Sequence, residues 1–104
     1  MSNMGDQLIS SVFKALAHPT RIKIVNLLRN GEMCVCEILS NLDSEQSNTS
    51  QHLTVLKNQG LVESRKDGSK VIYSIKNKEV YEMIDLAEVI ILRQIEETKT
   101  SLTK

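Results

Sequence analysis

Apolar residues recur every three or four positions in five stretches of this chain. That spacing places them on one side of an α-helix, so each stretch is predicted to be helical. Pro19 suits the first turn of a helix with His18 at or near its N-cap, and Asn30 and Gly31 end the apolar repeat that follows. The spacing predicts helices over residues 5–16, 19–29, 33–42, 45–58 and 77–98.

Two stretches between the fourth and fifth predicted helices have a different pattern. Residues 61–66 and 70–75 contain β-branched and alternating residues, and Asp67, Gly68 and Ser69 between them form a turn sequence. We therefore predict a β-hairpin over residues 61–75. The expected architecture is mainly α with this small hairpin, in a single domain over residues 1–104, since a chain of 104 residues fits one compact unit.

The predicted helices at 45–58 and 77–98 differ in their apolar surface. The first has one narrow apolar line, Thr49, Leu53 and Leu56, so most of its surface is expected to be exposed. The second has an apolar stripe that is too wide for a chain this small to cover. We therefore expect a homodimer that forms through the N- and C-terminal helices, with the interface residues Val80, Ile84, Ala87 and Ile91.

The formal net charge is zero, but the charges are unevenly distributed. Residues 1–78 carry ten Lys and Arg against seven acids, whereas residues 79–97 carry six acids and Arg93 alone. The basic surplus therefore lies in the part of the chain that contains the exposed helix and the hairpin, where a nucleic acid would bind. The longest apolar run is far shorter than the ~20 residues that span a bilayer, and the N-terminus has no leader pattern, so we expect a cytoplasmic protein without a membrane partner.

The chain lacks the residue patterns of common enzyme classes. It has no Cys-x-x-Cys, no HExxH, no Ser/His/Asp set and no Gly-rich phosphate loop among its four glycines. A thiol enzyme or a metal carrier is therefore disfavoured, and no obligatory cofactor is expected. A dimerising interaction module without DNA binding stays an alternative.

The order helix, helix, helix-turn-helix, hairpin and helix is that of a winged helix-turn-helix, and the residues that fill it resemble the ArsR/SmtB family of transcriptional repressors. The resemblance rests on LAHPTRI at residues 16–22, QSNTSQHL at 46–53, GLV at 60–62 and the Gly68 hairpin that ends in Tyr73. The segment EMCVCEI at 32–38 also resembles the thiolate box of the arsenic- and cadmium/lead-sensing branches. The resemblance implies a homodimeric repressor that binds double-stranded operator DNA and is released by an inducer.

A helix over residues 45–58 turns one polar face away from its apolar line, because successive residues are 100° apart. Short polar side chains on that face suit base edges in a major groove, and the helix N-terminus offers amides to a phosphate. Basic side chains at the hairpin tip suit phosphates or a minor groove, although a solvated polar face and an ordinary charged turn are the alternatives. The expected DNA-binding residues are Gln46, Ser47, Asn48, Ser50, Gln51 and Thr54 on the helix and Arg65, Lys66 and Lys70 on the hairpin.

Cys34 and Cys36 are the two cysteines, and a disulfide between them would close almost no chain and add little stability. Two thiolates suit a thiophilic inducer such as As(III), Cd(II) or Pb(II). Residues i and i+2 of a regular helix point about 200° apart, so both sulfurs can reach one ion only where the backbone is extended or distorted. A redox sensor that uses the same cysteines and a buried, inert pair are the alternatives. His18 is expected to cap a helix and His52 to hydrogen-bond to a neighbouring helix, rather than to bind metal.

Overall fold

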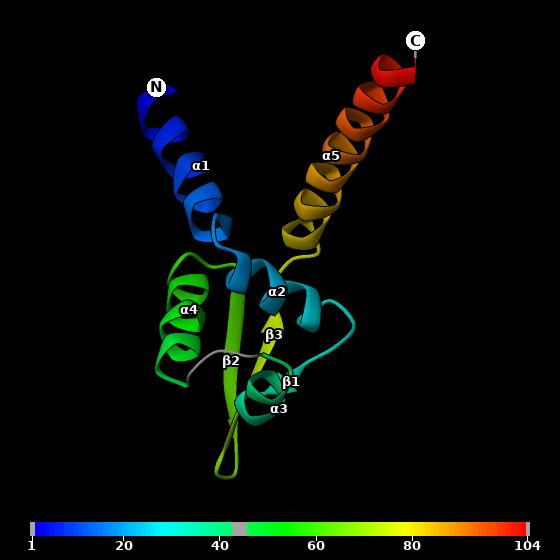
Figure 1. The fold of residues 1–104 in the computed structure, drawn as a ribbon. Coiled ribbons are helices and arrows are strands. Elements are labelled where there is room, and N and C mark those ends of the chain that lie inside the picture. Colours follow the sequence, from blue (N-terminus) through cyan, green and yellow to red (C-terminus); the bar gives the residue numbers. More distant parts are fainter. Residues whose placement is uncertain (1, 43–45, 104) are drawn as a thin grey trace.

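The computed structural model describes residues 2–42 and 46–103, without the side chains of residues 2, 46, 47 and 103. Helices α1 and α5 project to the same side of a body formed by the other elements, and the turn between β2 and β3 lies at the opposite end (Figure 1). The five predicted helices and the predicted hairpin are confirmed. The elements are α1 (Ser2–Leu16), α2 (Pro19–Leu28), β1 (Met33–Cys34), α3 (Val35–Ser40), α4 (Gln46–Asn58), β2 (Val62–Asp67), β3 (Lys70–Ile75) and α5 (Glu79–Thr103).

The sheet contains one strand more than the predicted hairpin. Its strands are antiparallel in the order β1-β3-β2, and Met33 and Cys34 of β1 lie opposite Tyr73 and Ile72 of β3. The prediction that a helix begins at residue 33 is wrong, since α3 begins at Val35. The physical reason is that the open edge of β3 presents backbone N–H and C=O groups, and this short strand pairs with them.

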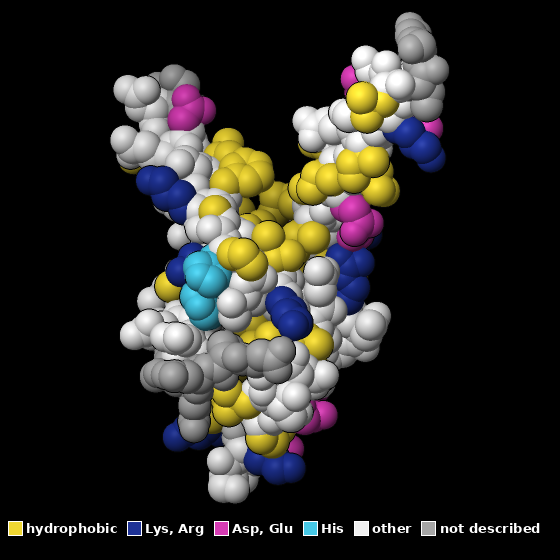
Figure 2. All heavy atoms as spheres, in the orientation of Figure 1, with side chains coloured by type: hydrophobic (Ala, Val, Ile, Leu, Met, Phe, Trp, Pro, Cys, Tyr) yellow, Lys and Arg dark blue, Asp and Glu magenta, His cyan; other side chains and the backbone are white. Residues whose placement is uncertain are grey.

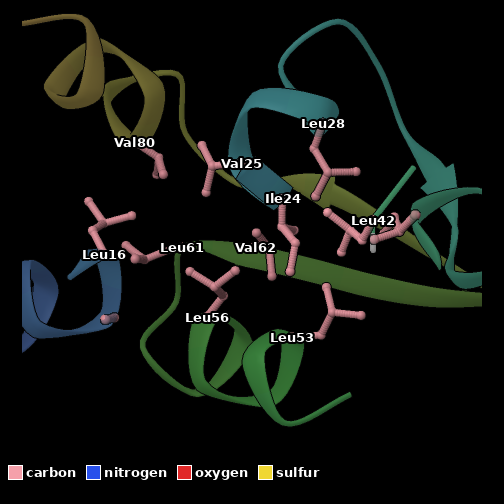
Figure 3. Close-up of a cluster of buried hydrophobic side chains, with 12 residues drawn as sticks. Leu16, Ile24, Val25, Leu28, Leu42, Leu53, Leu56, Leu61, Val62 and Val80 are labelled. Atoms are coloured by element: carbon pink, nitrogen blue, oxygen red, sulfur yellow. The ribbon is translucent and has the colours of Figure 1, made fainter. Parts of the chain in front are cut away.

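The hydrophobic core lies where α2, α4, the sheet and the first turn of α5 meet (Figure 3). Leu53 and Leu56 of α4 lie on the side of that helix that faces β2, near Val62 (Figure 3). Val80 is only 3% exposed and belongs to the same core. The buried cluster comprises Ala15, Leu16, Ile24, Val25, Leu28, Ile38, Leu42, Leu53, Leu56, Leu61, Val62 and Val80.

Local sequence signals set the ends of several elements. His18 has an extended backbone and its Nδ1 accepts a hydrogen bond from the Thr20 N–H at 3.1 Å, so it is the N-cap of α2, as predicted. Gly60 follows α4 with a φ of 78°, and Gly68 lies in the turn between β2 and β3 with a φ of 64°. Glycine adopts these left-handed conformations without steric cost, which suits the end of a helix and a tight hairpin turn.

Helices α1 and α5 leave much of their apolar surface uncovered. Figure 2 shows yellow side chains on the sides of the two helices that face each other. The exposed large apolar residues are Met4, Leu8, Ile9 and Phe13 on α1, and Leu86, Val89, Ile90, Ile91, Leu92, Ile95 and Leu102 on α5. So large an apolar surface is typical of an interaction site. No helix of the described chain is both long enough and apolar enough to cross a membrane.

Candidate nucleic-acid interface and cysteine pair

Helix α4 has the two faces that its sequence predicts. Thr49, Leu53 and Leu56 are all buried and hold the helix against the body. The polar side chains that were predicted for DNA binding, and that the structure describes on this helix, lie exposed: Asn48, Ser50, Gln51 and Thr54. The buried line thus orients α4 so that its polar side chains point into solvent, where a ligand can reach them.

Thr54 and two further predicted residues, Gln46 and Ser47, complete the description of this face. The Thr54 hydroxyl donates a hydrogen bond to the Ser50 carbonyl oxygen at 2.9 Å. Its oxygen lone pairs therefore stay available as acceptors. Gln46 and Ser47 belong to the first turn of α4, but their side chains lie outside the described residues.

A side-chain cluster between α2 and α4 fixes the position of α4. Arg21 Nε donates a hydrogen bond to His52 Nδ1 at 3.1 Å, and Arg21 Nη1 lies 3.4 Å from each of the carbonyl oxygens of Lys14 and Ala15. The rings of His18 and His52 lie 4.2 Å apart between their centroids. Burial, followed by the charges of His18 and Arg21, lowers the pKa of His52. His52 is therefore a neutral acceptor that joins α4 to α2, which confirms the predicted hydrogen bond to a neighbouring helix.

The wing, formed by β2 and β3, carries three exposed basic residues, Arg65, Lys66 and Lys70. Dark-blue side chains mark this end of the molecule in Figure 2. Lys66 and Lys70 form no ion pair with any residue that the structure describes. Arg65 differs, because its Nη2 forms an ion pair with Glu32 Oε2 and its Nη1 lies 3.9 Å from Asp67 Oδ2. The pair with Glu32 joins the wing to the loop before β1.

Cys34 and Cys36 meet because the backbone changes from strand to helix between them. Cys34 has a φ of −74° and a ψ of 160°, the extended conformation that allows sulfurs at i and i+2 to approach each other. The two residues form a disulfide with their Cα atoms 5.3 Å apart. Cys34 is 3% exposed, whereas Cys36 is exposed. The sequence disfavoured a structural disulfide. The bond that is present closes a very short loop, so its restraint is limited to the end of β1 and the start of α3.

Cys34 is also part of a capping box at the start of α3. Its Sγ accepts a hydrogen bond from the Glu37 N–H at 3.2 Å, and Glu37 Oε1 accepts one from the Cys34 N–H at 3.0 Å. The sequence contained a signal for this contact, because Glu three residues after the cap is the usual spacing of such a box. It was missed because cysteine stands where serine or threonine is expected. The Cys34 sulfur is therefore tied to the first turn of α3.

A metal ion at this pair would need donors besides the two sulfurs. Within residues 2–42 and 46–103, no group of three or more His, Cys, Asp or Glu side chains is arranged to hold a metal ion. Glu37 is close in sequence, but one of its carboxylate oxygens accepts the Cys34 N–H. The cysteine pair thus offers two thiolates when reduced, and the remaining ligands of an ion would come from outside this set.

The four residues predicted for a dimer interface lie in different surroundings. The prediction that Val80 lies in the dimer interface is wrong. The first turn of α5 packs onto the body and leaves this side chain no surface for a partner. Ile84 is half-buried against the core, and Ala87 is exposed. Ile91 is 53% exposed on the projecting part of α5. Ala87 and Ile91 therefore continue the stripe of Val80 and Ile84 beyond the body.

The chain is similar to transcriptional regulators over most of its length. Residues 18–64 match the family described as "Bacterial regulatory protein, arsR family". The cadmium resistance transcriptional regulatory protein CadC of Listeria innocua is 39% identical over 87 residues, which cover 83% of this chain and 73% of that protein.

Two solved structures share the fold. The crystal structure of Mycobacterium tuberculosis Rv0081 matches with a TM-score of 0.80 at 39% identity, over 88% of this chain and 93% of that one. The solution structure of the homodimeric winged helix-turn-helix DNA-binding domain Mb0332 of Mycobacterium bovis, a possible ArsR-family regulator, matches with a TM-score of 0.81 at 30% identity, over 92% and 89%. The chain therefore belongs to the arsR family of bacterial regulatory proteins and is a transcriptional regulator with a winged helix-turn-helix fold.

Proposed function

We propose that this regulator is a homodimeric repressor in the cytoplasm that binds double-stranded operator DNA and releases it when the state of Cys34 and Cys36 changes. The position of the pair carries the proposal. Cys34 is the last residue of β1 and the N-cap of α3, and α3 is the helix that precedes α4 along the chain. A chemical change at these sulfurs therefore acts on the first turn of α3 and on the sheet that carries the wing.

Helix α4 and the wing form the DNA interface in this proposal. The exposed amides of Asn48 and Gln51 suit base edges of a major groove, and the exposed Lys66 and Lys70 suit phosphates. The chain has as many acids as bases, so unspecific attraction to DNA is small. Affinity then depends on two half-sites, about 34 Å apart, that a symmetric dimer reads together.

The uncovered apolar surface of α1 and α5 supports the homodimer. A second copy of the chain offers the same apolar faces, so the two copies can cover each other. The related domain Mb0332 is described as homodimeric. On α5, the proposed interface residues are Ile84, Ala87 and Ile91.

Oxidation is the stimulus that the geometry favours, because the two sulfurs are joined and the described residues offer no third donor. Oxidation removes two electrons and two protons from the two thiols, and a hydroperoxide takes them and leaves as an alcohol and water. A small thiol reverses the step by attack on the exposed Cys36, which releases Cys34 as a thiolate. That thiolate accepts the Glu37 N–H at the start of α3, which stabilises it. A second small thiol then frees Cys36.

A thiophilic inducer is the second candidate, and the similarity to the cadmium resistance regulator CadC favours it. In the reduced protein, Cys34 and Cys36 would supply two thiolates to As(III), Cd(II) or Pb(II). The extended backbone at Cys34 brings both sulfurs to one side, as shared coordination needs. A third donor would come from a small thiol or from the second copy of the chain.

Fluorescence anisotropy with labelled DNA from upstream of the coding region separates the two candidates. With oxidation as the stimulus, a hydroperoxide should weaken DNA binding by about tenfold or more, and dithiothreitol should restore it. With an ion as inducer, arsenite or cadmium should weaken binding under reducing conditions. Cys34→Ser and Cys36→Ser should abolish either response. A double serine variant that still releases DNA under the same treatment would contradict the role of the pair.

The DNA interface has a separate test on α4. Asn48→Ala and Gln51→Ala should each weaken specific binding and leave the dimer intact. Asn58→Ala is the matched control, since Asn58 is also exposed but lies at the other end of α4, outside the predicted DNA-binding set. If all three variants bound DNA as the wild type does, α4 would not be the reading helix.

A further inference from the structure

Cys34 and Arg65 lie in one row that crosses the sheet. Cys34 of β1 is opposite Ile72 of β3, and the same Ile72 is opposite Arg65 of β2. Residues directly opposite each other in antiparallel strands project from the same face of the sheet. Adjacent strands lie about 4.8 Å apart. Because β3 lies between β1 and β2, the backbones of Cys34 and Arg65 are two strand spacings, or roughly 10 Å, apart.

A side-chain contact joins the same two regions a second time. Glu32 lies immediately before β1, two residues from Cys34, and its carboxylate pairs with the Arg65 guanidinium. The side chain of Glu32 is 48% exposed and that of Arg65 is 57% exposed. Ion pairs this exposed are weak in water, so a DNA phosphate can replace Glu32 as the partner of Arg65. Glu32 and a DNA phosphate would therefore compete for the Nη2 group of Arg65.

We propose that Glu32 is a positioning residue that competes with an operator phosphate for Arg65, and that the disulfide between Cys34 and Cys36 holds Glu32 in place to do so. This inference rests on the proposed function and names the route by which the cysteine pair weakens DNA binding. In the disulfide form, the bond restrains the end of β1, and Glu32 pairs with Arg65. In the dithiol form, only the pairing with β3 holds the two residues of β1, so Glu32 is no longer fixed beside Arg65. Arg65 is then free to bind a DNA phosphate.

The salt dependence of DNA binding measures the phosphate contacts directly. Log K falls as log salt concentration rises, and each phosphate that a side chain neutralises makes this negative slope steeper by about 0.9. A symmetric dimer has two copies of Arg65, so the slope of the wild type should be steeper by about 1.8 in the reduced state than in the oxidised state. The measurement is anisotropy of the intact protein on its upstream DNA, at several salt concentrations, with and without hydroperoxide.

Three variants assign this difference to the ion pair. Glu32→Gln should give the steep slope of the reduced wild type in both redox states, and its loss of affinity on oxidation should shrink to about twofold or less. Arg65→Gln should give the shallow slope in both states. Glu63→Gln is the matched control, because it removes the same charge from an exposed side chain of β2. It should keep the full difference in slope.

The outcomes separate the inference from the proposed function. A wild type whose DNA affinity ignores oxidation would overturn the oxidation mechanism and the inference together. A wild type that responds, with a Glu32→Gln variant that responds equally, would overturn the inference and leave the proposed function standing. Equal loss of the response in Glu32→Gln and Glu63→Gln would also overturn it, because a general charge effect would then explain the result. Circular dichroism of each variant confirms that the exposed substitutions leave the fold unchanged.

Discussion

Shortening Ile91 to alanine should weaken the proposed homodimer by a predictable amount. Ile91 is 53% exposed in one protomer, so about half of its surface stays available for a partner to bury. Full burial of such a side chain is worth about 1.5–3 kcal/mol, so the remaining half contributes about 1 kcal/mol per copy. The symmetric dimer loses this term twice, about 2 kcal/mol. That loss corresponds to a roughly 30-fold higher dissociation constant.

Sedimentation equilibrium over a range of protein concentrations measures the dissociation constant of Ile91→Ala. The matched control is Val89→Ala, since Val89 is 41% exposed but lies two residues away, about 200° around α5. Ile91→Glu extends the test, because each buried carboxylate without a partner costs several kcal/mol, so this variant should be monomeric. Circular dichroism reports whether α5 stays helical in each variant.

The reasoning fails if Val89→Ala raises the dissociation constant as much as Ile91→Ala does. The stripe through Ile84, Ala87 and Ile91 would then not be the interface. A dimer of Ile91→Glu as tight as that of the wild type would refute it as well. Either outcome would refute the symmetric dimer proposed here, and with it the half-site spacing that depends on that dimer. Neither outcome bears on the proposed role of α4 in DNA binding.

Three further predictions concern the protomer itself. Leu56→Ala should lower the free energy of unfolding by about 2–5 kcal/mol in urea titrations, since Leu56 is fully buried in the core, while the exposed Lys57→Ala should change it by less than about 0.5 kcal/mol. The folded-state pKa of His52 lies below its ordinary 6.5, so on acidification the unfolded chain takes up the proton first. The free energy of unfolding should therefore decrease as the pH is lowered from about 6.5, and it should level off once His52 is protonated in the folded protein as well. His52→Gln should flatten this pH dependence in urea titrations, and an unchanged dependence would show that His52 does not cause it. Glu37→Ala removes the acceptor of the Cys34 N–H and should cost about 1 kcal/mol, whereas Glu37→Gln keeps an acceptor and should cost less; equal losses would contradict the capping box.

Spacing along the chain was enough to find the helices, because each has a buried side that the sequence repeats. The apolar line of α4 predicted both its bounds and its exposed face, since Thr49, Leu53 and Leu56 leave one orientation against the body. Strand β1 could not be found in this way. Two residues carry no periodicity, and they become a strand only because β3 offers an open edge for them.

In the candidate site, features formed by residues close in sequence could be predicted, whereas contacts between residues far apart in sequence could not. The polar side chains of α4 and the basic wing were predictable, because neighbours in sequence define them. The pair of Glu32 with Arg65 joins residues 33 positions apart, and no local pattern records it. Val80 was misplaced for a related reason: the apolar stripe of α5 is continuous, and only the fold shows where the body ends and the projecting part begins.

The distribution of strong and weak contacts decides where a signal from the cysteine pair can act. Helix α4 is fixed by Leu53 and Leu56 in the core and by the Arg21–His52 hydrogen bond, so moving it requires the loss of several buried contacts. The contacts around the wing are weaker, because β1 has two residues and the partners of Arg65 are exposed. The three-residue disulfide ring contributes less stability than the ~3 kcal/mol of a 15-residue loop. A free-energy change of less than ~3 kcal/mol can break the exposed ion pair between Glu32 and Arg65 but cannot move the packed helix α4. The wing is therefore the element that a disulfide at this position can control.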